Sequence, residues 1–219
     1  MCYNDRIKMR SEADDMALTM VHLLVADLWA QGHPEYRVSP EFYLGAVSPD
    51  AVHIRDHNDK SHKDEIHLYN WRRLHREPLL DYWHKRSAPF DIGYGVHVLT
   101  DCQWVSRYVQ RLPGIMLPTG LLNIDIYYND TFVTDFALYN SRPRLREVLS
   151  MLEDAQAPWD HPLLTHYEFD EWRKAMLAAY RGKCPKSVPV KFIDEAYVAD
   201  FAADSIPLIE EMYKEAFPD

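Results

Sequence analysis

The chain has 219 residues, of which 47% are hydrophobic and 26% are charged, a composition typical of a folded globular domain. Its net charge of −10 and the lack of a basic stripe argue against a protein that grips a nucleic acid backbone. The three cysteines are scattered, so the sequence shows no disulfide framework and no cysteine-rich zinc motif. The sequence shows no signal peptide and no run of about 18 apolar residues, so we expect a cytoplasmic protein without a transmembrane segment.

Helical patterns dominate the first half of the chain, after a loose extension over residues 1–14. The first predicted helix runs from Asp15 to Gly32 and carries an apolar stripe. A short helix follows Ser39, and residues 46–63 are predicted to form a long loop that is polar and rich in His and Asp from residue 51. Residues 64–87 read as helix on both sides of Pro78, which should break or kink that helix.

The second half is also predicted to be helical. Asp91 is expected to cap a helix that reaches about Leu112. Ser205 and Pro207 are expected to open the last helix. Between these two helices, further helical patterns cover about residues 120–139, 141–155, 167–182 and 188–204. Since no strand pattern has comparable strength, we expect an all-α fold, a single-domain helical bundle over residues 15–219.

His97 and Asp101 are the most informative pair in the sequence, within "FDIGYGVHVLTDCQW". Their i, i+4 spacing puts both side chains on one helix face, about 5–6 Å apart at Cβ. Two ionisable groups in an apolar helix are costly unless something compensates them. A shared metal ion would do so, and so would a hydrogen bond that ties down a core histidine.

Three further residues strengthen the metal interpretation. His22 lies in the apolar "MVHLLVADL", Asp50 follows Pro49 at the end of an apolar segment, and His62 lies in the polar "DKSHKDE". Taken singly, these are a core histidine, a turn aspartate and a surface histidine. Together with the helical pair they form a set of nitrogen and oxygen ligands that suits zinc, and also manganese or iron. His67 could replace or join His62.

In this order, the stretches "MVHLLVADL", "YLGAVSPDAV", "KSH" and "GYGVHVLTDCQW" resemble the zinc-dependent phospholipase C family and its zinc nuclease relatives. The resemblance covers about residues 16–140 and implies an all-α fold. It also implies metal ligands at five positions: His22, Asp50, His62, His97 and Asp101. Asp101 would be able to bridge two ions.

The resemblance also implies a ligand further along the chain, in "IYYNDTF". Relatives often have a histidine before Asn-Asp there, whereas this chain has Tyr128 followed by Asn129 and Asp130. Asp130 is the candidate ligand, and Asp135 is the competing choice. The family histidine six residues after the helical aspartate is replaced by Arg107. One or two ions are therefore expected rather than three.

The expected function is that of a metal-dependent phosphoesterase, with phospholipase C-like hydrolysis of a phosphodiester by a metal-activated water. Asp50 would orient that water or accept its proton. Since no membrane-binding amphipathic helix is evident, a small soluble phosphoester is as plausible a substrate as a lipid. A non-catalytic protein that keeps the fold and a structural ion is the alternative. An HD-type phosphohydrolase is disfavoured because the sequence has no His-Asp dipeptide.

Overall fold

A computed structural model describes residues 18–56, 61–68, 76–112, 115, 123–181 and 188–218, and within 105–111 it describes the backbone alone. All regular elements in these ranges are helical, which confirms the predicted all-α class. The predicted extension over residues 1–14 lies outside the described residues, as does the side chain of Arg107.

The helices follow one another along the chain, and most described connections are short, except for the non-helical residues 152–165 between α10 and α11. Their bounds are α2 Thr19–Trp29, η1 Ala30–Gly32, α3 Pro34–Arg37, α4 Pro40–Gly45, η2 Pro49–Ala51, α5 Val52–Asp56, α6 Lys63–Ile66, α7 Arg76–Lys85, α8 Pro89–Arg111, α9 Ile124–Ser141, α10 Pro143–Met151, α11 His166–Arg181 and α12 Glu195–Ala216.

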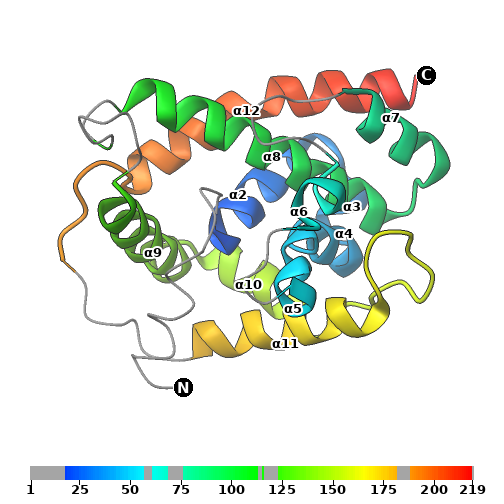
Figure 1. Cartoon of the computed structure of the whole chain (residues 1–219), viewed down its shortest axis with the longest axis horizontal. Helices are drawn as coiled ribbons and strands as arrows, with labels where there is room; N and C mark the ends of the chain where they lie inside the picture. Colours follow the sequence, from blue (N-terminus) through cyan, green and yellow to red (C-terminus); the bar gives the residue numbers. More distant parts are fainter. Residues whose placement is uncertain are drawn as a thin grey trace.

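Helices α2 and α8 form the centre of the molecule (Figure 1). Helix α8 packs against α2, α4, α7 and α12, and α2 also packs against α9 and α12. In the view of Figure 1, α12 runs along the top and α11 along the bottom. The two central helices carry His22, His97 and Asp101, so these candidate residues lie in the interior.

Helices α4 and α8 approach each other closely because both contact positions are glycines. A Cβ atom on Gly45 would lie 2.0 Å from the Phe90 carbonyl oxygen. A Cβ atom on Gly93 would lie 1.9 Å from the Phe42 carbonyl oxygen. Neither distance is compatible with van der Waals radii, so any side chain here would push the helices apart. This close contact sets the position of the segment after α4 relative to α8.

Side-chain caps start several helices where the sequence provides them. Ser39 accepts a hydrogen bond from the Phe42 backbone N–H, and Pro40 occupies the first position of α4. Asn123 accepts from the Ile126 N–H at the start of α9, and Asp194 does the same for α12. These caps satisfy backbone donors that have no partner within the helix.

Some predicted elements were wrong in detail. Residues 51–56 lie in η2 and α5 rather than in a loop. Pro78 lies within α7, and the predicted helix before it falls partly on residues 69–75, which lie outside the described residues. Asp91 lies inside the first turn of α8 and accepts hydrogen bonds from Tyr82 and Arg86 instead of capping the helix.

The C-terminal region also differs from the prediction. Residues 188–194 are not helical, and α12 begins at Glu195. The helix then continues through Pro207 to Ala216, so Ser205 and Pro207 do not open a new one. Ser205 is buried, and its hydroxyl donates to the Phe201 carbonyl oxygen one turn earlier. Burial of the apolar face of α12 thus outweighs the helix-breaking tendency of proline.

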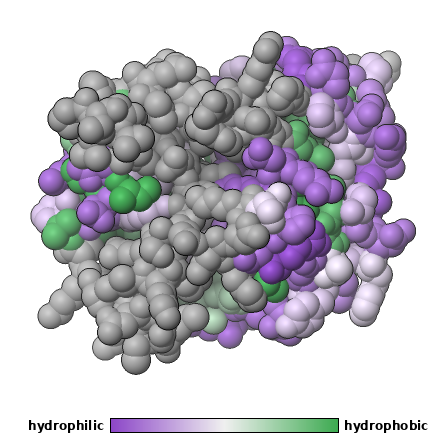
Figure 2. Space-filling model, viewed as in Figure 1, coloured by the Kyte–Doolittle hydropathy of each residue, from purple (hydrophilic) through white to green (hydrophobic). Residues whose placement is uncertain are grey.

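Hydrophilic side chains predominate on the right-hand part of the face shown in Figure 2, and apolar ones appear there only in small areas. None of the helices in the described ranges has both the length and the apolar character needed to cross a membrane.

Candidate metal centre

Four buried side chains converge on one point in the interior. Asp50, His67, His97 and Asp101 each offer a ligand atom, and these atoms all lie within 4.8 Å of one another. Asp50 lies in η2, His67 directly follows α6, and the other two lie one turn apart on α8. Three separate segments therefore contribute to the same cluster, as is usual for a metal-binding site.

Helix α8 supplies the central pair. The His97 Nε2 atom lies 3.4 Å from Asp101 Oδ2 across one helical turn. On the other side of the ring, His97 Nδ1 lies 2.9 Å from the Ala46 carbonyl oxygen. Because a carbonyl oxygen can only accept, Nδ1 carries a proton, and this leaves Nε2, the atom that faces the cluster, as the ring nitrogen that can bind a metal ion.

His67 is oriented in the same way. Its Nδ1 atom lies 3.0 Å from the Lys63 carbonyl oxygen. Its Nε2 atom lies 3.6 Å from Asp101 Oδ2 and 3.7 Å from Asp50 Oδ1. Metal-binding histidines in proteins usually donate their second ring nitrogen to a carbonyl or carboxylate, and both His67 and His97 follow this rule.

Asp50 closes the cluster from the side of η2. Its Oδ1 atom lies 3.8 Å from His97 Nε2. The Asp50 side chain is 13% exposed, whereas those of His67, His97 and Asp101 are at most 1% exposed. Asp50 is therefore the member of the cluster nearest to solvent.

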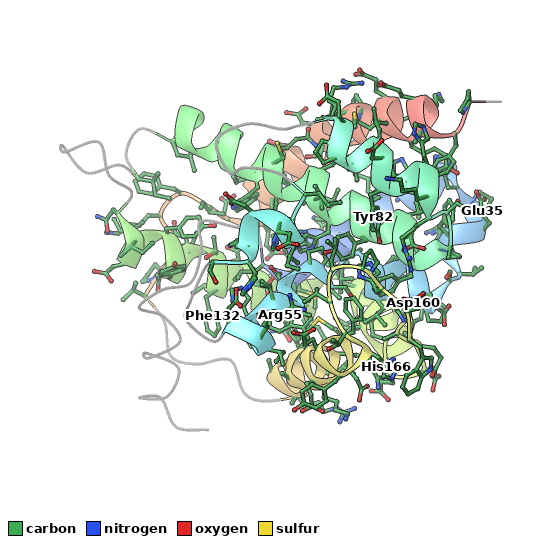
Figure 3. The ribbon with its side chains drawn as sticks, turned by 45° about the vertical axis from the view of Figure 1, so that its right-hand side comes forward. Glu35, Arg55, Tyr82, Phe132, Asp160 and His166 are labelled. Atoms are coloured by element: carbon green, nitrogen blue, oxygen red, sulfur yellow. The ribbon has the colours of Figure 1, made fainter. Side chains whose placement is uncertain are left out.

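The segment that carries Asp50 makes hydrogen bonds to α11 both before and after Asp50 in the sequence. Before Asp50, the Trp172 indole N–H donates to the Val47 carbonyl oxygen at 2.7 Å. After it, the Arg55 guanidinium donates to both carboxylate oxygens of Glu168, at 2.6 and 3.0 Å. Figure 3 shows Arg55 on α5, above α11. Since Glu168 and Trp172 lie one turn apart on α11, one helix face holds the Asp50 segment in place.

The cluster carries two negative charges in a buried place. Burial raises the pKa of Asp50, but His97 and His67 outweigh it and hold this pKa below its usual range. Burial likewise raises the pKa of Asp101, and His22 and His97 lower it well below its usual range. Both carboxylates are therefore ionised, and a cation bound between them would offset their mutual repulsion.

His22 lies beside the cluster, next to Asp101 and His97. Its Nε2 atom is 3.2 Å from Asp101 Oδ1, without the direction of a hydrogen bond, and its ring stacks on His97 at 3.8 Å. The ring is buried, and neither of its nitrogens makes a hydrogen bond in the described part of the chain. His97 Nε2 likewise makes none. An unsatisfied buried polar atom costs about 1–3 kcal/mol, so these nitrogens fit a site that binds a metal ion.

The structure places His67, and not His62, in the cluster. The His62 side chain is 47% exposed, and its Nδ1 atom lies 2.7 Å from Asp56 Oδ1. His62 stands just before the first residue of α6 and His67 just after the last. The sequence-based choice of His62 as ligand is therefore not supported by the geometry, which favours the alternative.

Asp130 also lies outside the cluster. Its carboxylate accepts hydrogen bonds from the backbone N–H groups of Lys191, Phe192 and Ile193, at 2.6–3.2 Å. This bonding gives Asp130 a structural role, because it fixes the turn before α12.

Asp135, the competing choice, is equally engaged elsewhere. It accepts from the Met20 backbone N–H at 2.8 Å and from the Tyr180 hydroxyl. Burial raises the pKa of Asp135 to about 6. Since Leu18 gives α2 no side-chain cap, Asp135 provides the acceptor for the start of the helix that carries His22.

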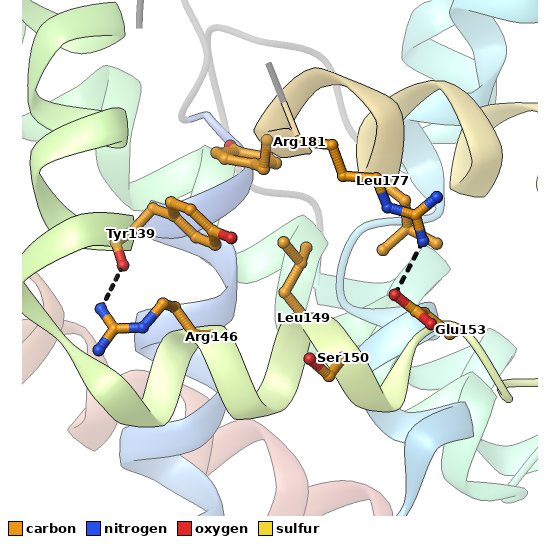
Figure 4. A pocket seen from close by; sticks show the side chains of 8 residues that line it. Tyr139, Arg146, Leu149, Ser150, Glu153, Leu177 and Arg181 are labelled. Carbon is orange, nitrogen blue, oxygen red and sulfur yellow. Dashed lines mark hydrogen bonds and ion pairs between the residues drawn. The ribbon is translucent and has the colours of Figure 1, made fainter. Parts of the chain in front are cut away.

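A pocket of about 230 Å³ lies away from the cluster, between α9, α10 and α11 (Figure 4). Arg146 at its edge donates to the Tyr139 carbonyl oxygen at 2.9 Å, and Arg181 donates to Glu153 at 2.9 Å. Both guanidinium groups are thus engaged by the protein. The convergent ligand atoms, and not this pocket, mark the candidate site.

Comparisons of the chain with protein-family models, with curated proteins and with solved structures gave no match. The resemblance to the zinc-dependent phospholipase C family therefore stays a prediction from the sequence. The buried cluster of Asp50, His67, His97 and Asp101, whose ligand atoms could hold a metal ion, is the structural feature that points to a function.

Proposed function

We propose that this chain is a metal-dependent phosphoesterase, in which Asp50, His67, His97 and Asp101 hold a divalent metal ion. The observation that carries the proposal is the convergence of these four ligand atoms within 4.8 Å in a buried place. Nitrogen and oxygen ligands of this kind suit zinc, and they also accept manganese or iron. His22 would position Asp101 or provide a ligand atom for a second ion.

A divalent ion held here would polarise a phosphoryl oxygen and lower the pKa of a coordinated water to about 7. The residues of the chain have separate tasks. His67 and His97 present Nε2 because their Nδ1 protons are held by backbone carbonyls. Asp101 is fully buried, lies within 3.6 Å of His22, His67 and His97 nitrogens, and would hold the ion.

Asp50 is the best candidate for a catalytic role among the four. It is ionised, and it is the most exposed member of the cluster. An ionised carboxylate beside the position of an attacking water can orient that water and accept its proton. The substrate would approach from the side of Asp50, and a small soluble phosphoester meets this requirement without a membrane-binding surface.

A non-catalytic role for the metal is the second candidate. One observation favours it: the cluster offers four protein ligands, the number found in closed structural zinc sites. In that case the ion would stabilise the fold by tying η2 and the turn after α6 to α8. Both roles require a bound metal ion, but only the catalytic role predicts hydrolysis of a phosphoester.

Hydrolysis of nitrophenyl phosphodiesters and phosphomonoesters by the zinc- or manganese-loaded chain tests the proposal. We expect slow cleavage that a chelator abolishes and added metal restores. Asp50→Asn should lower kcat more than it raises KM, because Asp50 would act in the hydrolytic step. Asp91→Asn on α8 removes a buried carboxylate outside the cluster and serves as the control. A metal-loaded chain that leaves every phosphoester intact would establish the non-catalytic role.

A further inference from the structure

The position of His67 needs an explanation, because the helix before it is too short to be stable alone. Helix α6 has four residues, Lys63–Ile66, and isolated helices of this length do not form in water. The His67 backbone N–H and its Nδ1 atom both bond to the Lys63 carbonyl oxygen, within the same turn. These local bonds orient the ring within α6, and they do not fix α6 relative to α8.

Tyr94 on α8 makes a direct link to this segment. Its hydroxyl donates to the Ile66 carbonyl oxygen at 2.6 Å, and its side chain is fully buried. Burial raises the pKa of Tyr94 well above its usual value, so the hydroxyl keeps its proton and stays a donor. The accepting carbonyl belongs to the residue directly before His67.

Tyr94, His97 and Asp101 follow one another at i, i+3 and i+7. This spacing puts all three on one face of α8. The face that supplies two of the four ligand atoms therefore also supplies the bond to the segment that carries a third. A rigid helix is a precise support for such an arrangement.

The backbone after His67 is independent evidence that this segment is held in place. Leu68 has a φ of +55°, in the left-handed region that side chains other than glycine rarely adopt. Such a conformation persists only when the surrounding structure imposes it, and it is common beside functional sites. The strained residue directly follows the candidate ligand.

We propose that Tyr94 is a positioning residue that holds the turn at Ile66 against α8 and thereby presents His67 to the metal site. This inference rests on the metal centre of the proposed function and goes further by assigning a role to a residue that offers no ligand atom itself.

Tyr94→Phe removes a single oxygen and is the direct test. Tyr82→Phe is the matched control. Tyr82 is buried next to Tyr94, with ring centroids 5.2 Å apart, and its hydroxyl bonds to Asp91 and His161, away from the cluster. Both variants lose one buried hydroxyl, so a general loss of stability affects both.

Cobalt(II) titration of the full chain, followed by its visible spectrum, measures the first effect. We expect Tyr94→Phe to weaken Co²⁺ binding by about 10–100-fold, as is typical for partners of metal ligands, and to change the spectrum. Tyr82→Phe should change the affinity by less than about twofold. In a His67→Ala background, Tyr94→Phe should have little further effect, because Tyr94 acts through His67. Equal affinities of the Tyr94→Phe and Tyr82→Phe variants would overturn the inference.

Hydrogen exchange of the metal-free chain gives a readout that does not depend on metal. The His67 and Leu68 amides bond to the Lys63 and Glu65 carbonyls, and Tyr94→Phe should lower their protection about tenfold more than Tyr82→Phe does. Unchanged protection would overturn the inference even if metal binds. If the wild-type chain bound no Co²⁺, the proposed function would fall, and this exchange comparison would still decide whether Tyr94 holds His67.

Discussion

Asp101→Asn should remove most of the stabilisation that a bound metal gives to this chain. The side chain is fully buried, and its oxygens lie 3.2 Å from His22 Nε2 and 3.4 Å from His97 Nε2. Asparagine has nearly the same shape as aspartate, so the packing is preserved. The change removes a negative charge and an anionic ligand from the centre of the cluster.

The size of the effect follows from linkage. At a free zinc concentration 100 times the Kd, binding stabilises the native state by about 2.7 kcal/mol. An unfolding entropy of about 2.1 cal/mol/K per residue converts this into a Tm increase of about 6 °C for 219 residues. Loss of a partner of a metal ligand already costs about 10–100-fold in affinity, so loss of a ligand should cost at least about 100-fold. The remaining stabilisation is about 0.4 kcal/mol, or about 1 °C.

Differential scanning calorimetry with and without zinc, at one fixed free zinc concentration, measures this difference. Asp91→Asn on the same helix is the control. It removes a buried carboxylate that bonds to Tyr82 and Arg86, so it should lower the Tm of the metal-free chain and leave the zinc-induced increase intact. An Asp101→Asn variant with the full wild-type increase would show that Asp101 only tethers His97, and the reasoning would be refuted.

Three further predictions concern other parts of the molecule. Gly93→Ala should lower the free energy of unfolding, measured with urea, by about 1–3 kcal/mol or more, because the new Cβ would lie 1.9 Å from the Phe42 carbonyl oxygen. A decrease below about 0.5 kcal/mol would contradict the close α4–α8 contact. His67→Ala should abolish most zinc uptake in equilibrium dialysis while His62→Ala leaves it unchanged, and the reverse result would restore the sequence-based choice. Burial lowers the pKa of His161 to about 4, so the unfolded chain takes up this proton before the folded chain does as the pH falls. Between pH 7 and pH 5, the free energy of unfolding should therefore fall by about 2 kcal/mol more in the wild-type chain than in His161→Phe. Equal pH dependence of the free energy of unfolding in the two chains would contradict this.

The helical pair was the part of the site that sequence could predict. His97 and Asp101 lie on one helix, whose geometry fixes the distance between them. The structure indeed places them 3.4 Å apart. His22 and Asp50, both within apolar surroundings in the sequence, also lie at the cluster or beside it. A local sequence pattern is enough to predict that two residues lie close together when both belong to one helix.

The choice between His62 and His67 could not be made from local pattern. Five residues correspond to about 140° of rotation on a helix, so only one of the two can face α8. Which one does so depends on the contact of α6 with α8, including the bond from Tyr94 to Ile66. That contact joins residues 28 positions apart and leaves no periodic signal in the sequence.

The role of Asp130 also could not be predicted from the residues around it in the sequence. Its position in "YYND" suggests a ligand, but its oxygens are used by backbone N–H groups of Lys191, Phe192 and Ile193, about 60 residues downstream. Such a long-range partner cannot be read from composition or spacing. Similarly, the continuation of α12 through Pro207 depends on burial against the central helices rather than on helix propensity.

Metal content of the full chain is the most direct test of the metal centre. The purified chain is equilibrated with zinc, freed of excess metal and analysed for elemental zinc, beside the His97→Ala variant treated in the same way. We predict about one to two ions per wild-type chain and a small fraction of that in the variant, because His97 Nε2 faces both carboxylates. A wild-type chain that retains neither zinc nor manganese would contradict the central claim that Asp50, His67, His97 and Asp101 form a metal site.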